Sequence, residues 1–304
     1  MADGSGDPDG HDTHVRPHVG AGPDVATWWI GTIEMPKIRT SPALRLEADL
    51  LGRLDVRAPT GRQVRLPGRH AQALFALLVL AHRPRSREAI AADLWPDAGG
   101  ASAGSLRQAL WLVRQALTEA GVLTEDVLDI EADTVGIRID TRIDLDITAF
   151  ESCLLDEACA AETAVELYHG DLLEGLGHDC FAAERERLSD RFEDALALVA
   201  EQRLAAGNPS GAREAAERLL ERDPLREEAH AVLIGVHGLI GSRSQVIRQY
   251  RRLSDVLHRE LGETPLPDTE AIYRQAIDGT MRRALERAER LDAARPPLLV
   301  AVGR

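Results

Sequence analysis

The segment from Gly68 to Leu117 constrains the fold of this chain more than any other, because it predicts three short helices joined by tight polar turns. An apolar run from Ala71 to Ala81 forms the first helix, and a break at Pro84 leads into the second. After a loop of small residues, Ser102 to Leu117 predicts a third, amphipathic helix. Three helices of about average length can bury one shared face as a helix-turn-helix, which leaves the third free to enter a DNA groove.

The third helix has one apolar and one polar face when it is placed on a wheel of about 100° per residue. Its polar side carries Arg107 and Arg114 about two turns apart, where guanidinium groups could reach phosphates or guanine edges. Trp111 on the same side leaves two interpretations open: a DNA contact, or packing against the wing or a neighbouring protomer. The apolar face predicts a core stripe of Leu106, Leu110, Val113 and Leu117.

Alternating apolar residues on both sides of the three helices predict the rest of a winged-helix domain. Between Leu44 and Leu66 they predict a small antiparallel sheet before the first helix. After the third helix, Val127 to Ile130 and Val135 to Ile139 predict two strands of a hairpin, joined through Asp133 and Thr134. An N-terminal sheet, three helices and a C-terminal hairpin are the order of elements in the OmpR-like winged helix.

The pattern is helical throughout residues 146–290, and it repeats. Gly207 and Gly241 are 34 residues apart, which is the period of tetratricopeptide repeats. Stacked repeats bury a common core and leave a concave face. Candidates to line that face are Tyr250, Arg251, His258 and Tyr273, although the two tyrosines could equally be core.

Charge is distributed unevenly along the chain. Residues 43–120 carry 11 Lys or Arg against 7 Asp or Glu, whereas residues 121–304 carry 22 against 37, and the whole chain has a formal net charge of −14. Only the predicted winged helix is basic, which suits a protein whose phosphate-binding surface is confined to one module. The overall acidity therefore does not argue against DNA binding.

Four segments, taken in order, resemble the SARP-type antibiotic regulatory activators of bacteria. They read LLGRLDV (Leu50 to Val56), RLPGRHAQALFALLVLA (Arg65 to Ala81), SREAIAADLWPD (Ser86 to Asp97) and SLRQALWLVRQAL (Ser105 to Leu117). The resemblance covers residues 43–277. It implies a transcription factor that binds direct repeats in double-stranded promoter DNA, recruits RNA polymerase through its sigma subunit, and leaves a homodimer on DNA open.

The fold expected from these patterns and from the resemblance is mainly α with small β, a winged helix-turn-helix followed by an all-α tetratricopeptide-like domain. We expect a disordered N-terminal tail at 1–42 and an OmpR-like winged-helix DNA-binding domain at 43–145. The resemblance implies a bacterial transcriptional activator domain at 146–280. Residues 281–304 are expected to be the end of the last helix and a tail.

The predicted function is a sequence-specific DNA-binding transcriptional regulator, an activator that recruits RNA polymerase. The alternative is a tetratricopeptide-like adaptor whose winged helix no longer binds DNA. The candidate DNA-binding residues are Arg69, Arg85, Arg87, Ser105, Arg107, Gln108, Trp111, Arg114, Gln115 and Arg138.

Two departures from the family pattern favour the alternative. Many family members have a second arginine where this chain has Gln115. The wing turn, Glu131 to Thr134, carries two acids where a minor-groove contact would require a cation. Arg138 is expected to point outward between inward-facing Ile137 and Ile139, and it could partly substitute.

No enzyme activity, cofactor or metal site is expected. A P-loop requires a lysine after its glycines, and Lys37 is the single lysine of the chain. Gly100 to Gly104 matches the nucleophile elbow G-x-S-x-G, but no apolar strand precedes it, so Ser102 is expected to cap the third helix. The histidines and cysteine between His169 and Cys180 lack the spacing of zinc ligands.

The first 42 residues are rich in Gly, Asp, Pro and His, with Trp28 to Ile30 as an apolar exception that either docks on the winged helix or forms an interaction patch. Three cysteines cannot pair completely, and no signal segment is evident. No apolar stretch approaches the ~20 residues that span a bilayer. We therefore expect a cytoplasmic, nucleoid-associated protein.

Overall fold

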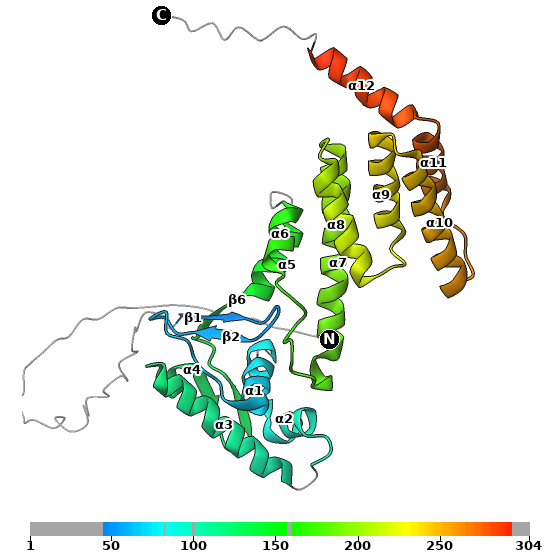
Figure 1. Ribbon diagram of the computed structural model, residues 1–304. Coiled ribbons are helices and arrows are strands. Elements are labelled where there is room, and N and C mark those ends of the chain that lie inside the picture. The colour runs from blue at the N-terminus through cyan, green and yellow to red at the C-terminus, as the bar shows by residue number, and fades with distance from the viewer. Residues whose placement is uncertain (1–44, 82, 99–100, 157–159, 294–304) are drawn as a thin grey trace, which may run out of the picture. The chain divides into compact units, whose positions relative to one another are not determined.

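The structure is a computed structural model that describes residues 45–81, 83–98, 101–156 and 160–293 (Figure 1). The tail expected at 1–42, including Trp28 to Ile30, lies outside these ranges. The described chain is a winged helix-turn-helix followed by an all-α tetratricopeptide-like domain, so the predicted fold class is confirmed.

The first sheet of the winged helix has three strands in the order β2-β1-β6. Strands β1 (Arg45–Asp49) and β2 (Asp55–Arg57) are antiparallel, as expected. The prediction that this sheet lies wholly before the first helix is wrong, because its third strand is β6 (Arg142–Leu145), which runs parallel to β1. Val64 and Leu66 are buried, but near them only an isolated bridge joins Gln63 to β2.

The three predicted helices are α1 (Gly68–Ala81), α2 (Arg87–Leu94) and α3 (Ser102–Glu119). Helix α2 begins where the Ser86 hydroxyl accepts the Ala89 N–H at 3.1 Å, which satisfies one of the unpaired amides of the first turn. Helix α3 is amphipathic, and it packs against α1 and α2. Its apolar face is buried, so the expected core stripe is confirmed, with Leu106, Leu110, Val113 and Leu117 all at most 6% exposed.

The wing is the predicted hairpin. After a single turn, α4 (Thr124–Val127), strand β4 (Leu128–Ile130) pairs antiparallel with β5 (Thr134–Ile137). A two-residue strand, β3 (Arg85–Ser86), pairs with the other edge of β5 and so connects the wing to the start of α2.

The helical domain contains α5 to α12 and a short 3₁₀ helix, Asp179–Phe181, before α7. Helices α7, α9 and α11 contact one another in succession, whereas α8 and α10 pack against them from one side. The helix bounds are α5 (Asp146–Leu155), α6 (Ala161–Leu167), α7 (Ala182–Ala205), α8 (Pro209–Arg222), α9 (Glu227–Ile240), α10 (Arg243–Glu260), α11 (Pro267–Ile277) and α12 (Thr280–Ala293).

Helices that touch from repeat to repeat lie on the inner side of a curved stack, where the spacing is shorter. The inner layer is therefore α7, α9 and α11, and the expectation that Arg251 and His258 of α10 line it is wrong. A 34-residue period does not say which helix of each pair faces inward. Tyr250 and Tyr273 stack at 4.1 Å between ring centroids and pack on a small apolar cluster around Ile234, which supports the core alternative.

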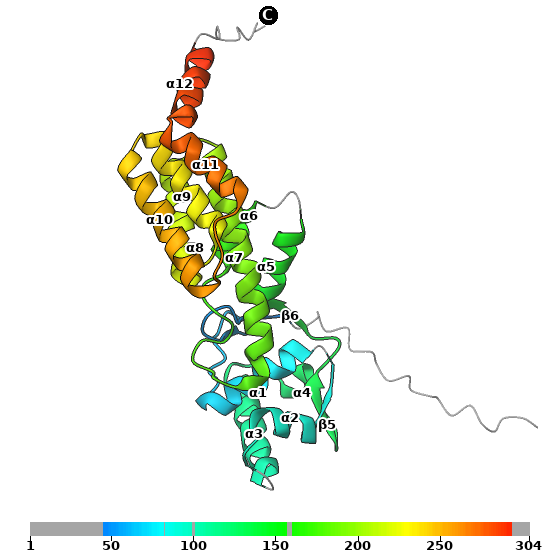
Figure 2. The same cartoon turned by 90° about the vertical axis from the view of Figure 1, so that its right-hand side faces the viewer.

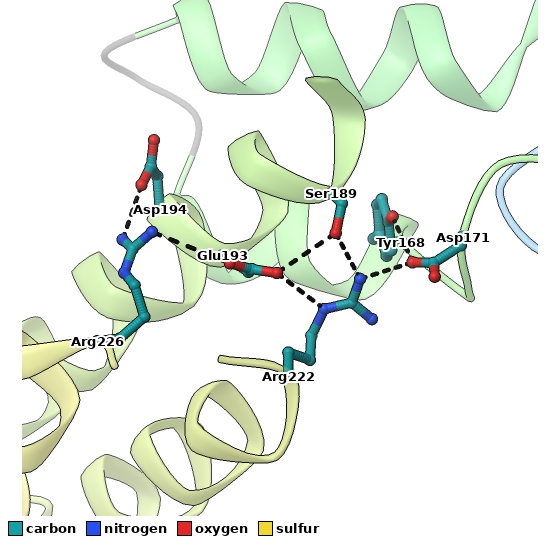
Figure 3. Close-up of polar contacts among 7 residues, drawn as sticks. All are labelled: Tyr168, Asp171, Ser189, Glu193, Asp194, Arg222 and Arg226. Atoms are coloured by element: carbon teal, nitrogen blue, oxygen red, sulfur yellow. Dashed lines mark hydrogen bonds and ion pairs between the residues drawn. The ribbon is translucent and has the colours of Figure 1, made fainter. Parts of the chain in front are cut away.

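A polar cluster, shown in Figure 3, ties the end of α8 to α7 and to the segment after α6. The Arg222 guanidinium donates to Asp171 and to Ser189 at 2.6 Å each, and its Nε donates to Glu193 at 3.4 Å. The Tyr168 hydroxyl donates to the same Asp171 at 3.0 Å, and burial raises the pKa of Tyr168, so it stays a donor. One guanidinium thus holds together three segments that are distant in sequence.

The same guanidinium lies against aromatic rings. Its carbon is 5.3 Å from the ring centroid of Phe192 and 5.8 Å from that of Tyr168, and these two rings stack at 4.1 Å. Arg226 extends the cluster along α7, donating to Asp194 at 2.8 Å. The rings of Tyr168 and Phe192 are buried, whereas the side chains of Arg222 and Asp171 remain partly exposed to solvent.

The strand hairpin of the winged helix is bonded to the segment that follows α6. The Gly52 N–H donates to the Asp171 carbonyl at 3.0 Å, and the Leu173 N–H donates to the Leu50 carbonyl at 2.8 Å. The carboxylate of Asp146, at the start of α5, accepts the N–H groups of Leu50 and Leu51 at 2.8 and 2.7 Å. Burial raises the pKa of Asp146, and these amide hydrogen bonds oppose the rise.

Buried histidines predict that stability falls in mild acid. Burial lowers the pKa of His178, His230 and His237 below the ordinary value of 6.5, so the unfolded chain binds more protons as the pH falls through 6.5. The stabilisation that comes from keeping these rings neutral is complete above pH 6.5. It is lost as the pH falls from 6.5 through the lower pKa values that the three histidines have in the folded protein. Urea titrations at pH 7.5 and 5.5 will show a smaller free energy of unfolding at pH 5.5.

The matched variant is His230→Gln. His230 contacts the Pro224 carbonyl and Gln249 at 3.1 and 2.8 Å, and glutamine does not titrate. The variant should lose less stability than the parent protein between the two pH values. An equal loss would show that His230 is not one of the responsible groups.

Candidate nucleic-acid interface

The outward face of α3 is the strongest candidate for contact with DNA. Figure 2 shows α3 at one end of the winged helix, with α2 between it and β5. Arg107, Trp111 and Arg114 follow one another at i, i+4 and i+7, and all three are exposed, Trp111 to 60%. The side chains of Arg107 and Arg114 make no ion pair or hydrogen bond with any residue in the described ranges.

The burial of the opposite face explains this exposure. Leu106, Leu110 and Val113 anchor α3 against the core of the winged helix, which leaves the basic side facing solvent. Trp111 stacks on no other ring in the described ranges and is 60% exposed. Its contact with DNA, with the wing or with a neighbouring protomer stays a prediction.

Three smaller polar side chains of α3 complete the predicted set. Gln108 is exposed beside Arg107. Gln115 is exposed and donates to Glu119 at 2.9 Å, and Ser105 donates to the Ala101 carbonyl at 3.4 Å. Of the three, Gln108 is the one without a hydrogen bond inside the described helix.

The helix start differs from the expectation at Ser102. The N-cap residue is Ala101, in helical conformation, and its N–H already donates to the Ala98 carbonyl at 3.0 Å. Ser102 is therefore the first residue of α3 and not its cap.

Arg87 supports the wing turn. Its guanidinium donates to the Glu131 carbonyl at 3.1 Å, and its N–H donates to the Asp133 carbonyl at 2.9 Å. Further along the same edge of β5, a side chain at Gly136 would begin 2.7 Å from the Cα of Pro84, so only glycine allows the two backbones to approach this closely. Backbone contacts between the wing and the segment before α2 thus set the position of the wing. The tip of the wing carries the acidic side chains of Glu131 and Asp133.

The remaining predicted arginines are engaged elsewhere. Arg85 forms an ion pair with Asp93 of α2 at 2.7 Å. Arg138 pairs with Asp140 at 3.0 Å, and this hydrogen bond raises the pKa of Arg138. The expectation that Ile139 faces inward is wrong, since it is fully exposed at the end of the wing.

Arg69 lies apart from α3, close to the loop of the helical domain. Its Nη2 is 3.7 Å from where a side chain at Gly177 would begin, and its charge lowers the pKa of His178, after burial and His70. The structure therefore brings together six of the ten predicted residues, all on α3, and places Arg69, Arg85, Arg87 and Arg138 around them or away from them.

Sequence reasoning missed Arg62, which lies beside the C-terminal end of α3. It is exposed, and its Nη1 is 4.0 Å from where a side chain at Gly121 would begin. Arg62 belongs to a loop without periodicity. The one sequence feature that could have marked it as a candidate DNA contact is the basic composition of residues 53–69.

Other kinds of site find no support in the described part of the chain. No group of three or more His, Cys, Asp or Glu within it could hold a metal ion. No helix there combines the length and the apolar character needed to cross a membrane.

A winged helix-turn-helix joined to stacked helix pairs, together with the family match of the helical part, defines the class of this chain as a transcriptional regulator. Residues 150–277 match the family model described as "Bacterial transcriptional activator domain". The family is one of regulators and not a class of enzymes. The match confirms the resemblance to SARP-type activators.

The fold is similar to that of a solved structure, "Mycobacterium tuberculosis EmbR in complex with low affinity phosphopeptide". The TM-score is 0.64 at 23% sequence identity, and the similarity covers 82% of this chain and 71% of the other. At this identity the likeness shows the fold alone. No curated protein matches the sequence of this chain.

Proposed function

We propose that this chain is a sequence-specific DNA-binding transcriptional activator that recruits RNA polymerase to promoters. The observation that carries the proposal is the outward face of α3, where Arg107 and Arg114 are exposed and unpaired among the described residues while the opposite face is core. A helix of 18 residues in a helix-turn-helix presents such a face to the major groove. The SARP-type resemblance adds the expected partners: promoter direct repeats, the polymerase sigma subunit, and a homodimer on DNA.

Each residue of this face has a distinct proposed role. Arg107 and Arg114 would contact guanine edges or phosphates, Gln108 would contact adenine, and Trp111 would contact a thymine methyl or a sugar. Arg87 would act through the wing by holding its turn, since its guanidinium is bonded to the Glu131 carbonyl. The boundaries 43–145 for the DNA-binding domain and 146–280 for the activator domain, and action at the nucleoid, belong to the same proposal.

The test is DNA binding by the whole protein as a function of salt. In fluorescence anisotropy on the duplex upstream of its own gene and of neighbouring genes, affinity should fall steeply with salt, because each neutralised phosphate releases counterions. A plot of log K against log salt should have a slope of about −0.9 for each phosphate contacted. A random duplex of equal length is the control, and it should bind more weakly at every salt concentration.

A second candidate function rests on the wing. With Glu131 and Asp133 at its tip and Arg138 paired to Asp140, the wing offers no free cation to a minor groove. An adaptor that uses its helical domain and no longer binds DNA would fit that feature. Binding that is absent on all duplexes, or that does not respond to salt, would favour the adaptor.

A further inference from the structure

Helix α10 borders a hollow of about 520 Å³, closed on the other side by the first turn of α9 and the loop at Pro224. Its volume falls within the range of ligand pockets. Its lining consists of Pro224, His230, Arg248, Arg251, Arg252, Asp255, Val256 and Arg259. Arginine is thus the dominant side chain of the hollow, which belongs neither to α3 nor to the wing.

Most of this positive charge is uncompensated. Arg248, Arg251 and Arg252 are exposed and make no ion pair or hydrogen bond through their side chains with the described residues, whereas Arg259 pairs with Glu260 at 2.8 Å. Asp255 is the one acid among the lining residues. The surrounding region carries 22 basic against 37 acidic residues, so a row of unpaired arginines here is a local reversal of charge.

His230 contributes a buried, hydrogen-bonded side chain to the lining of the hollow. The imidazole of His230 lies between the Pro224 carbonyl at 3.1 Å and Gln249 at 2.8 Å, and burial lowers the pKa of His230. The ring therefore stays neutral at physiological pH. Recognition of charge in this hollow falls to the arginines alone.

The spacing of the arginines indicates the shape of the ligand. From Arg248 to Arg259 the helix rises about 16 Å at 1.5 Å per residue, the length of about five residues of extended chain. A single phosphate or carboxylate would meet one or two of these guanidinium groups. A row of this length fits a linear anion, with carboxylates held in bidentate pairs.

We infer that this hollow binds an acidic peptide segment of a partner protein in extended conformation. A peptide fits better than DNA, because an extended chain is narrow enough to lie inside a hollow of about 520 Å³, whereas a duplex is a wide convex rod that would meet only its rim. The inference goes beyond the proposed DNA binding and holds or fails separately from it, since it uses none of the residues of α3.

The experiment is a titration of the whole protein into fluorescein-labelled hexaglutamate, followed by anisotropy at low salt. Arg251→Glu and Arg252→Glu should each weaken binding about tenfold, because each removes a charge-assisted hydrogen bond and adds repulsion. Arg243→Glu is the matched control: Arg243 is exposed at the start of the same helix, outside the hollow, and its reversal changes the net charge equally. Circular dichroism checks that all variants fold, and hexaglutamine should not bind.

Three outcomes would overturn the inference: no binding to the parent protein, equal weakening by Arg243→Glu, or displacement of hexaglutamate by a short duplex. The last would mark the row as a nucleic-acid contact. Affinity of every variant for promoter duplex is measured in parallel. Loss of peptide binding with intact DNA affinity supports the peptide site, whereas DNA binding that is absent in the parent protein would count against the proposed function alone.

Discussion

Replacing Arg107 or Arg114 by alanine will lower affinity for the specific duplex by about 1 to 3 kcal/mol if the guanidinium makes bidentate contacts with a base. If it contacts phosphate instead, the loss will be similar on every duplex and will diminish at high salt. Stability should change little in either case, because both side chains are exposed and unpaired among the described residues. Anisotropy on specific and random duplexes, with urea unfolding of the same samples, separates these outcomes.

Leu110→Ala is the matched change on the opposite face of the same helix. Leu110 is 6% exposed in the core, so the variant should lose roughly 2 to 5 kcal/mol of unfolding free energy through the cavity it leaves. Once folded, it should still bind DNA. If instead both arginine variants bind the specific duplex as tightly as the parent protein, α3 is not the reading helix and the proposed mechanism fails.

Arg222→Ala should be the most destabilising single change of an arginine in the helical domain. It leaves Asp171, Ser189 and Glu193 without their shared donor, and the Glu193 side chain is only 14% exposed. We expect a loss of about 2 to 3 kcal/mol, less than for a fully buried pair, because 26% of the Arg222 side chain is exposed. Urea unfolding of the whole protein measures the loss.

The control for this prediction is Arg218→Ala, one turn earlier on α8. Its guanidinium carbon lies 4.9 Å from the ring centroid of Phe192, the ring that Arg222 also touches, but the side chain is exposed. A surface cation–π contact is worth less than about 1 kcal/mol. Equal losses for the two variants would mean that the shared ring, and not the polar cluster of Figure 3, carries the stability.

Local periodicity was enough to predict which face of α3 is buried and which is exposed. The positions of Leu106, Leu110 and Val113 determine which face of α3 is buried, and the exposed face follows from the same 3.6-residue repeat. The wing hairpin is confirmed for the same reason. Each depends on neighbours in sequence.

Features that depend on distant partners could not be predicted in this way. Strand β6 pairs with β1 across nearly a hundred residues. Its four residues, RIDL, alternate between polar and apolar, but alternation does not say which strand is the partner. The ion pairs of Arg85 with Asp93 and of Arg138 with Asp140 are close in sequence, but only the folded backbone shows that these charged groups meet. A basic residue near a helix-turn-helix thus predicts a DNA contact only when no carboxylate lies within reach in the fold.

The hydrogen bonds at Leu50 and Gly52 determine where the chain can be cut. A fragment that stops at the wing would lose β6 and leave the edge of β1 open, and unpaired edges promote aggregation. A fragment ending at residue 145 would also lack the Asp146 carboxylate that accepts two amides of the hairpin. The shortest piece of the winged helix that keeps these backbone partners of the hairpin extends to Glu174, about thirty residues past the end of the winged-helix pattern.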